Sequence, residues 1–139
     1  MRKSIRSRTF LTGAAALTLL VTTSSPVLAD DGAAVEVLRT EELPGIPGKE
    51  AVMLTVTYPP GGSSMPHRHD AHVFVYVLEG SVVMQVDGEE PVTLRRGQTF
   101  HEKPSDVHRR SANASGTEPA KFLVFIVKDK GAPVSRPAE

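Results

Sequence analysis

Short runs of strand-forming residues, broken at almost every junction by glycine or proline, fill the chain from residue 51 to residue 129. "AVMLTVTY" alternates and ends at "PPGG", and the runs "VFVYVLEG" and "SVVMQVDG" meet at Gly80. β-Branched and aromatic residues favour strands, whereas glycine and proline favour the turns between them. No window after residue 29 shows a sustained helical period of apolar residues. The sequence therefore predicts an all-β domain, a small sandwich or barrel of about six to eight strands.

The first 29 residues are expected to be a secretory signal peptide. They open with a basic stretch without acids and continue with an apolar run that is short for a membrane span. They end in the small-residue sequence "VLA" before Asp30, which is typical of a cleavage site. A membrane anchor is the alternative interpretation. We expect a secreted or periplasmic protein with a polar arm over residues 30–48, the main domain over 49–130 and a disordered tail over 131–139. Within the arm, "VEVLRT" predicts one short strand.

Charge and cysteine content limit the partners of the exported chain. The whole sequence has 16 basic and 16 acidic residues, and the four basic residues of the signal peptide leave 12 against 16. Nucleic acids and anionic membranes need a basic face, so we expect neither as a partner. The chain has no cysteine, so export adds no disulfide and stability must come from a packed core or from subunit contacts.

Two strand-like runs, "VFVYVL" and "FLVFIV", are apolar at nearly every position. A half-buried strand normally alternates between apolar and polar residues, because successive side chains point to opposite faces. Continuous apolar runs fit strands that are covered on both faces, or a subunit interface that covers one of them. The second arrangement would make the protein a homodimer, and the first needs no partner.

All five histidines lie between positions 67 and 108, and three of them stand within six residues. Residues i and i+2 of a strand share a face, so His67 and His69 are expected to direct two imidazoles at one point. His108, on a later strand, is the expected third ligand. Imidazoles around open coordination positions suit Fe, Mn, Ni, Cu or Zn. The alternative is a set of exposed loop histidines.

Two blocks of the sequence resemble the two motifs of the cupin family. "GGSSMPHRHDAHVFVYVLEG" resembles the first, which runs G, five residues, H-x-H, three or four residues, E, six residues, G. "GQTFHEKPSDVHRRSAN" is similar to the second, with its proline and asparagine each displaced by one place. The matching residues are Gly61, His67, His69, Gly80, Gly97, Pro104, His108 and Asn113. The resemblance implies a jelly-roll barrel with a metal inside, frequently as a dimer.

The first motif departs from the family at its glutamate, which falls on Val73. A valine cannot bind a metal, so the site has either the three imidazoles alone or a further ligand from elsewhere in the chain. His72 is adjacent, and a β-bulge could turn it inward, although strict alternation would place it on the rim. Glu102 could supply a carboxylate, and its alternative is an exposed charge at a strand end. We expect His72 or Glu102 to complete the ligand shell or to move protons.

Cupins that this chain resembles include dioxygenases for enol or catechol-like substrates and several isomerases and lyases. The first functional hypothesis is therefore a metal-dependent oxidoreductase of the dioxygenase type, acting on a small enol or anionic organic substrate. An isomerase or a lyase is a weaker form of the same hypothesis. The second hypothesis is a cupin that binds a small ligand or a metal without turnover, because one barrel can host many activities.

Overall fold

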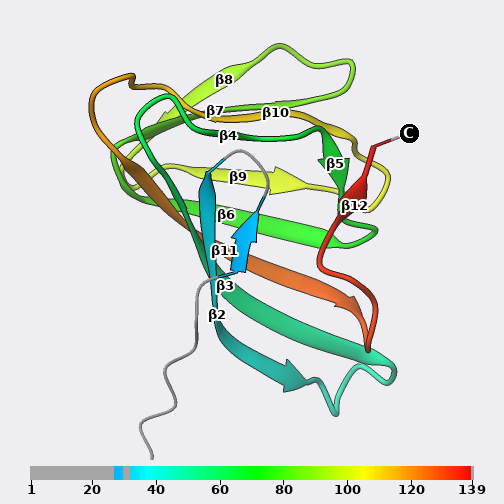
Figure 1. The fold of residues 1–139 in the computed structure, drawn as a ribbon. Helices are drawn as coiled ribbons and strands as arrows, with labels where there is room; N and C mark the ends of the chain where they lie inside the picture. Colours follow the sequence, from blue (N-terminus) through cyan, green and yellow to red (C-terminus); the bar gives the residue numbers. More distant parts are fainter. Residues whose placement is uncertain (1–26, 30–31, 139) are drawn as a thin grey trace, which may run out of the picture.

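The computed structural model of the protein describes residues 27–29 and 32–138, and these residues form strands and turns without a helix (Figure 1). The all-β prediction is therefore confirmed. The described part of the chain accordingly has no helix with the length and apolar character needed to cross a membrane. The predicted signal peptide lies outside the described residues, except for the short strand β1 at Val27–Ala29.

The described residues contain twelve strands, which are arranged in two sheets (Figure 1). The first sheet has the order β1-β2-β3-β11-β6-β9, and the second has the order β12-β5-β10-β7-β8, with β4 also paired to β10. The strands after β1 are β2 (Ala33–Glu42), β3 (Lys49–Tyr58), β4 (Ser63–Ser64), β5 (His67–Arg68), β6 (His72–Glu79), β7 (Ser81–Val86), β8 (Val92–Arg95), β9 (Thr99–Glu102), β10 (His108–Asn113), β11 (Ala120–Asp129) and β12 (Arg136–Pro137).

The core lies between the two sheets and is built by alternation along the strands. On β6, Val73, Val75 and Val77 are buried, whereas Phe74 and Tyr76 lie on the outer face and are 47% and 45% exposed. The period of two thus separates the apolar run "VFVYVL" into a core face and an aromatic outer face. That outer face is the surface that the predicted homodimer would cover, and the dimer stays a prediction.

Gly80, the last residue of the first motif, joins β6 to β7 in a conformation that other residues resist. Its φ is +68°, in the left-handed region. A Cβ at this position would lie 2.5 Å from the carbonyl oxygen of Pro119 and 3.1 Å from the Cα of Ala120. The tight turn and the close approach of a neighbouring loop both require glycine.

Both ends of the domain form strands. The short strand expected at "VEVLRT" within the polar arm lies inside the longer β2, which pairs with β3 from Ala34 to Glu42 and extends the first sheet. The tail, which we expected to be disordered, forms β12 beside β5 on the right of Figure 1. Composition indicated disorder because the tail is short and rich in proline, but an unpaired edge of β5 gives its backbone hydrogen-bond partners.

Glu50 and Lys128 form an ion pair at the base of the first sheet. The Lys128 side chain is 5% exposed and also donates to the carbonyl oxygen of Ala132 at 2.6 Å. The hydrogen bond from Lys128 lowers the pKa of Glu50 below its ordinary 4.5. This pairing stabilises the folded state above pH 4.5 and is lost as the pH falls through the lower folded-state pKa.

Glu50→Gln is expected to lower the melting temperature by several degrees at neutral pH, because it leaves a buried ammonium without its carboxylate. Lys128→Met should cost less, since it removes the buried charge and keeps the volume of the side chain. Melting curves between pH 7 and pH 3 test this: the deficit of Glu50→Gln relative to wild type should shrink below pH 4.5. A deficit that stays constant with pH would contradict the assignment.

Candidate metal centre

The rings of His67 and His69 meet through their Nε2 atoms, which lie 3.1 Å apart. The Nδ1 of His67 lies 2.7 Å from the carbonyl oxygen of Met65, and the Nδ1 of His69 lies 2.7 Å from that of Val134. A carbonyl oxygen only accepts, so each Nδ1 carries the proton and donates it. In the neutral rings both Nε2 lone pairs then face the same point, where a cation would satisfy both of them.

His108 completes the group from the next strand of the second sheet, because it pairs with His67 across β10 and β5. Its side chain is 3% exposed, and neither ring nitrogen has a hydrogen-bond partner. Among the buried side-chain nitrogen and oxygen atoms of the described residues, only the Nε of Arg68 shares that condition. One ligand atom from each of His67, His69 and His108 can be chosen so that all lie within 4.8 Å of one another. Buried polar atoms without partners are rare, and a shared metal would explain these.

Glu102 supplies a carboxylate to the same group from the opposite sheet. Its side chain is 3% exposed, and its Oε2 lies 3.1 Å from His108 Nδ1 and 3.8 Å from His69 Nε2. Glu102 is the cross-strand partner of Val73, where the first cupin motif has its glutamate. Directly opposed side chains share one face of the sheet. The Glu102 carboxylate on strand β9 therefore lies beside the place where the glutamate of the cupin motif would be on β6.

The shifts of Glu102 and His67 are in the directions that favour metal binding. Burial alone would raise the pKa of Glu102, but the contact with His108 and the charges of the nearby imidazoles lower it below its usual value. Burial lowers the pKa of His67, and the charges of His69 and His108 lower it further against the opposing bond to Met65. An ionised carboxylate and a neutral imidazole are the forms that coordinate a metal.

His72 is placed away from this group. It lies on the outer face of β6, where its Nδ1 is 3.2 Å from the Nε2 of His101 and the two rings stack with 5.4 Å between centroids. No bulge turns it inward, because β6 continues in register with β11 through Val73. The expectation that His72 is a ligand or a proton carrier in the same site is therefore corrected. His72 and His101 form a surface pair instead.

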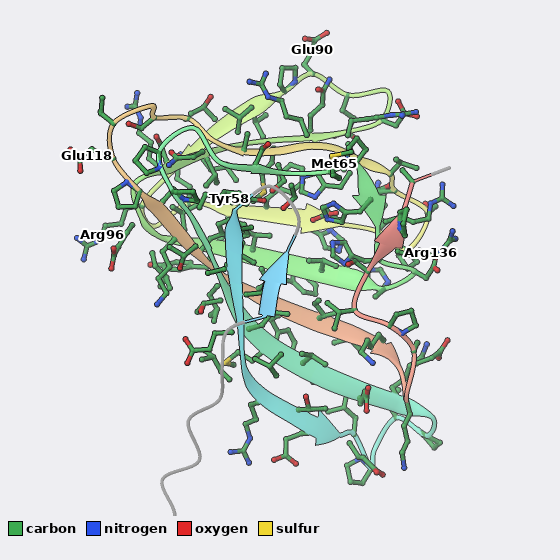
Figure 2. The ribbon with its side chains drawn as sticks, in the orientation of Figure 1. Tyr58, Met65, Glu90, Arg96, Glu118 and Arg136 are labelled. Atoms are coloured by element: carbon green, nitrogen blue, oxygen red, sulfur yellow. The ribbon has the colours of Figure 1, made fainter. Side chains whose placement is uncertain are left out.

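A cavity of about 610 Å³ opens beside the metal group and runs between the two sheets. Its wall is mostly apolar, and its few polar groups include three linked hydroxyls. The Tyr58 hydroxyl lies 2.6 Å from Ser64 Oγ and 2.8 Å from Ser111 Oγ (Tyr58 is labelled in Figure 2). Burial raises the pKa of Tyr58, so its phenol stays protonated. The apolar lining consists mainly of Leu54, Val56, Val73, Val75, Met84, Phe122, Val124 and Ile126.

Comparison of the sequence with known families matches residues 54–126 to the cupin domain. The chain is a cupin. The match covers just over half of the sequence and includes both histidine blocks. It supports the jelly-roll, or double-stranded β-helix, fold that the resemblance implied. Cupins commonly bind a divalent metal, and the three histidines are a donor set that fits one, with the Glu102 carboxylate beside them. A comparison with curated proteins finds no matching sequence.

Solved structures similar to this cupin share its fold at low sequence identity. A cupin-like protein from Thermotoga maritima is 19% identical, with a TM-score of 0.65 over 86% of this chain and 87% of the other. A recombinant oxalate oxidase in complex with glycolate is 22% identical, with a TM-score of 0.61 over 87% and 62%. The DMSP lyase DddQ from Ruegeria pomeroyi is 18% identical, with a TM-score of 0.55 over 63% and 43%. These likenesses establish the fold alone.

Sequence reasoning missed the groups that orient the ligands. The carbonyl oxygens of Met65 and Val134 hold His67 and His69, and main-chain carbonyls leave no mark in a sequence. The hydroxyls of Tyr58, Ser64 and Ser111 come from three strands, and only the observed register brings them together. An "S-S" pair ahead of the H-x-H motif was the one available signal, and taken alone it resembles an ordinary turn.

Proposed function

We propose that this cupin is exported, binds a divalent transition metal through His67, His69, His108 and Glu102, and oxidises a small enol or anionic organic substrate in a dioxygenase-like reaction. The observation that carries the proposal is the convergence of three imidazoles inside the barrel, with ligand atoms within 4.8 Å of one another and with both His108 nitrogens buried outside any hydrogen bond. When bound, a redox-active metal with open positions supplies oxygen activation and polarises a substrate oxygen.

The residues around the site would set the charge at the metal and transfer protons. His67, His69 and His108 each offer one imidazole nitrogen, and Glu102 adds a carboxylate that the first motif of this chain lacks at Val73. Three imidazoles without a carboxylate would leave the full double charge of the cation in place, so Glu102 reduces the preference for anions that such a site would have. Glu102 is also the acid–base group nearest to the ligand atoms and can hold a proton taken from a substrate hydroxyl.

The cavity favours a small organic substrate with one polar end. Its apolar wall excludes water from most of the surface, while the hydroxyls of Tyr58, Ser64 and Ser111 offer hydrogen bonds on one side. Among similar folds, the oxalate oxidase structure holds the hydroxy acid glycolate, and the DMSP lyase is named for a different reaction. These names support a small oxygen-bearing organic substrate and leave its identity open to experiment.

Binding without turnover is the second candidate function. It is favoured by the small number of titratable side chains in the lining of the cavity. Beyond the four proposed ligands, the titratable side chains that line the described cavity are Glu36, Tyr58 and Arg136. None of them forms an acid–base pair with Glu102 among the hydrogen bonds and ion pairs described. A site that only sequesters a metal or a small ligand needs no such pair.

The two candidates are separated by measuring metal content and oxygen uptake on the same preparation. Protein purified without a histidine tag, then loaded with Fe, Mn, Ni, Cu or Zn, is expected to retain a stoichiometric ion. Oxygen electrodes with a panel of enols, flavonols, diketones and short hydroxy acids should detect uptake with iron or copper. Uptake that disappears in His69→Ala supports the oxidase. Tight ligand binding without oxygen uptake for every metal supports the binder. Absence of retained metal contradicts the oxidoreductase and the metal binder, and leaves only a binder of metal-free ligands.

A further inference from the structure

The C-terminal segment Val134–Ala138, here called the strap, reaches back across the barrel to the metal centre. It contains β12, which pairs with β5 through Arg136 opposite Arg68 and Pro137 opposite His67. The backbone nitrogen of Ala138 donates to the carbonyl oxygen of Pro66 at 3.1 Å. In Figure 2 Arg136 lies on this strand beside β5, on the same side of the barrel as Met65. A segment about 65 residues away in sequence thus lies against the H-x-H motif.

The strap supplies the only hydrogen-bond acceptor described for the Nδ1 of His69, the carbonyl oxygen of Val134 at 2.7 Å. His67 has an equivalent acceptor in Met65, but that residue is only two positions away in the chain. The two imidazoles of the motif are therefore held in the same tautomer by different means. His67 is oriented locally, and His69 is oriented by the end of the chain.

An ion pair anchors the strap at its other end. Arg136 donates from Nε to Oδ2 of Asp70 at 2.5 Å and from Nη2 to Oδ1 at 3.0 Å, in a bidentate arrangement. Asp70 follows His69 directly and has a φ of +42°, in the left-handed region that aspartate tolerates. The anchor therefore fixes the turn that carries His69.

We infer that the strap is a positioning element of the metal centre: by holding Nδ1 of His69 through Val134 and the adjacent turn through Arg136 and Asp70, it directs Nε2 toward the shared ion. This inference rests on the proposed metal site. Acceptors behind a ligating histidine fix its tautomer and raise its basicity, and their loss typically costs about 10–100-fold in metal affinity. Val134, Ser135, Arg136 and Pro137 also line the cavity, so the strap forms part of the wall that a substrate contacts.

The strap contributes little to the core, which makes the inference testable without unfolding the protein. Val134 only packs against the edge of the buried cluster, and the side chains of Arg136 and Asp70 are 38% and 56% exposed. Exposed ion pairs add little to global stability. Removal of residues 134–139 should therefore leave the two sheets folded, because Lys128 still binds the carbonyl oxygen of Ala132.

The test compares the full chain with a strap deletion (residues 134–139 removed) and with Arg136→Ala, Arg136→Lys and Asp70→Asn. Nitrogen-15 NMR of the metal-free protein reports which imidazole nitrogen carries the proton. The deletion is expected to give His69 a mixture of tautomers and to leave His67 in its Nδ1-protonated form. Zinc affinity, from competition with a chromophoric chelator, is expected to fall by about 10–100-fold in the deletion. Arg136→Ala and Asp70→Asn should cause smaller, non-additive losses, and Arg136→Lys should recover part of the affinity.

Arg109→Ala is the matched control, because Arg109 forms a similar exposed ion pair with Asp87 away from the strap. It should change neither readout. An unaltered His69 tautomer and unaltered zinc affinity in the folded deletion would overturn the inference while leaving the metal site intact. If the deletion does not fold, Arg136→Ala and Asp70→Asn decide the question by the same two readouts. A changed tautomer in a protein that binds no zinc would uphold the positioning role and contradict the proposed function.

Discussion

Replacing His108 with alanine is expected to release the metal. The imidazole is buried, and its one close polar contact is between Nδ1 and Glu102 Oε2 at 3.1 Å, so little besides metal binding is lost with the ring. Changes behind a ligand already cost about 10–100-fold in metal affinity, and loss of a ligand should cost roughly 100-fold or more. Metal content after dialysis and zinc competition measure the effect directly.

The same variant should lose the thermal stabilisation that metal gives to wild type. A ligand at 100 times its dissociation constant stabilises a protein by about 2.7 kcal/mol, so metal should raise the wild-type melting temperature by several degrees. Arg109→Ala is the control, since Arg109 is the next residue along β10 and its side chain is exposed and paired with Asp87. His108→Ala protein that retains a full complement of metal would contradict the site as described.

The second large effect on metal affinity is expected when the buried carboxylate is moved from Glu102 on β9 to position 73 on β6. Glu102→Val should weaken metal binding by about 10–100-fold, because it removes the only acidic side chain described within reach of the histidines. Val73→Glu in the same chain should restore most of that loss. Val73 and Glu102 are directly paired across β6 and β9, so their Cβ atoms approach the cavity from neighbouring positions.

A displaced carboxylate provides the control for this exchange. Val75 is also buried and lines the cavity, but it pairs with Phe100, one inward-facing position farther along β6. Val75→Glu combined with Glu102→Val should not recover metal binding, because a strand advances about 3.3 Å per residue. Circular dichroism checks that each double variant folds, and Glu102→Gln alone carries the test if they do not. Unchanged affinity in Glu102→Val and Glu102→Gln would remove Glu102 from the site.

The histidine triad could be predicted from the sequence because it depends on local rules. Alternation within "H-R-H" brings His67 and His69 together, and the second motif places His108 on a strand that pairs with them. The same rule of alternation put His72 on the outer face, so the expectation of a bulge failed where simple periodicity held.

The remaining parts of the site depend on register, which a single sequence does not encode plainly. Nothing in the sequence around Glu102 marks it as the partner of Val73, since the pairing follows from how β6 and β9 align. The strap was also missed, because a short segment rich in proline gives no sign of a bidentate contact to a residue as distant as Asp70. The position of Glu102 and the contacts of the strap both depend on segments that are far apart in the sequence, and local sequence patterns carry no information about such pairings.

The pairing of Val73 with Glu102 has a consequence for how such sites diverge. Two positions that face each other across adjacent strands place their side chains close together, so a ligand atom can come from either strand. Two substitutions, one at each position, are then enough to move the carboxylate from one strand to the other. The intermediate sequence would have an acid at both positions or at neither, and in both cases the order of the strands stays the same. Searches that require a glutamate at a fixed linear distance from H-x-H would pass over chains in which this transfer has already happened.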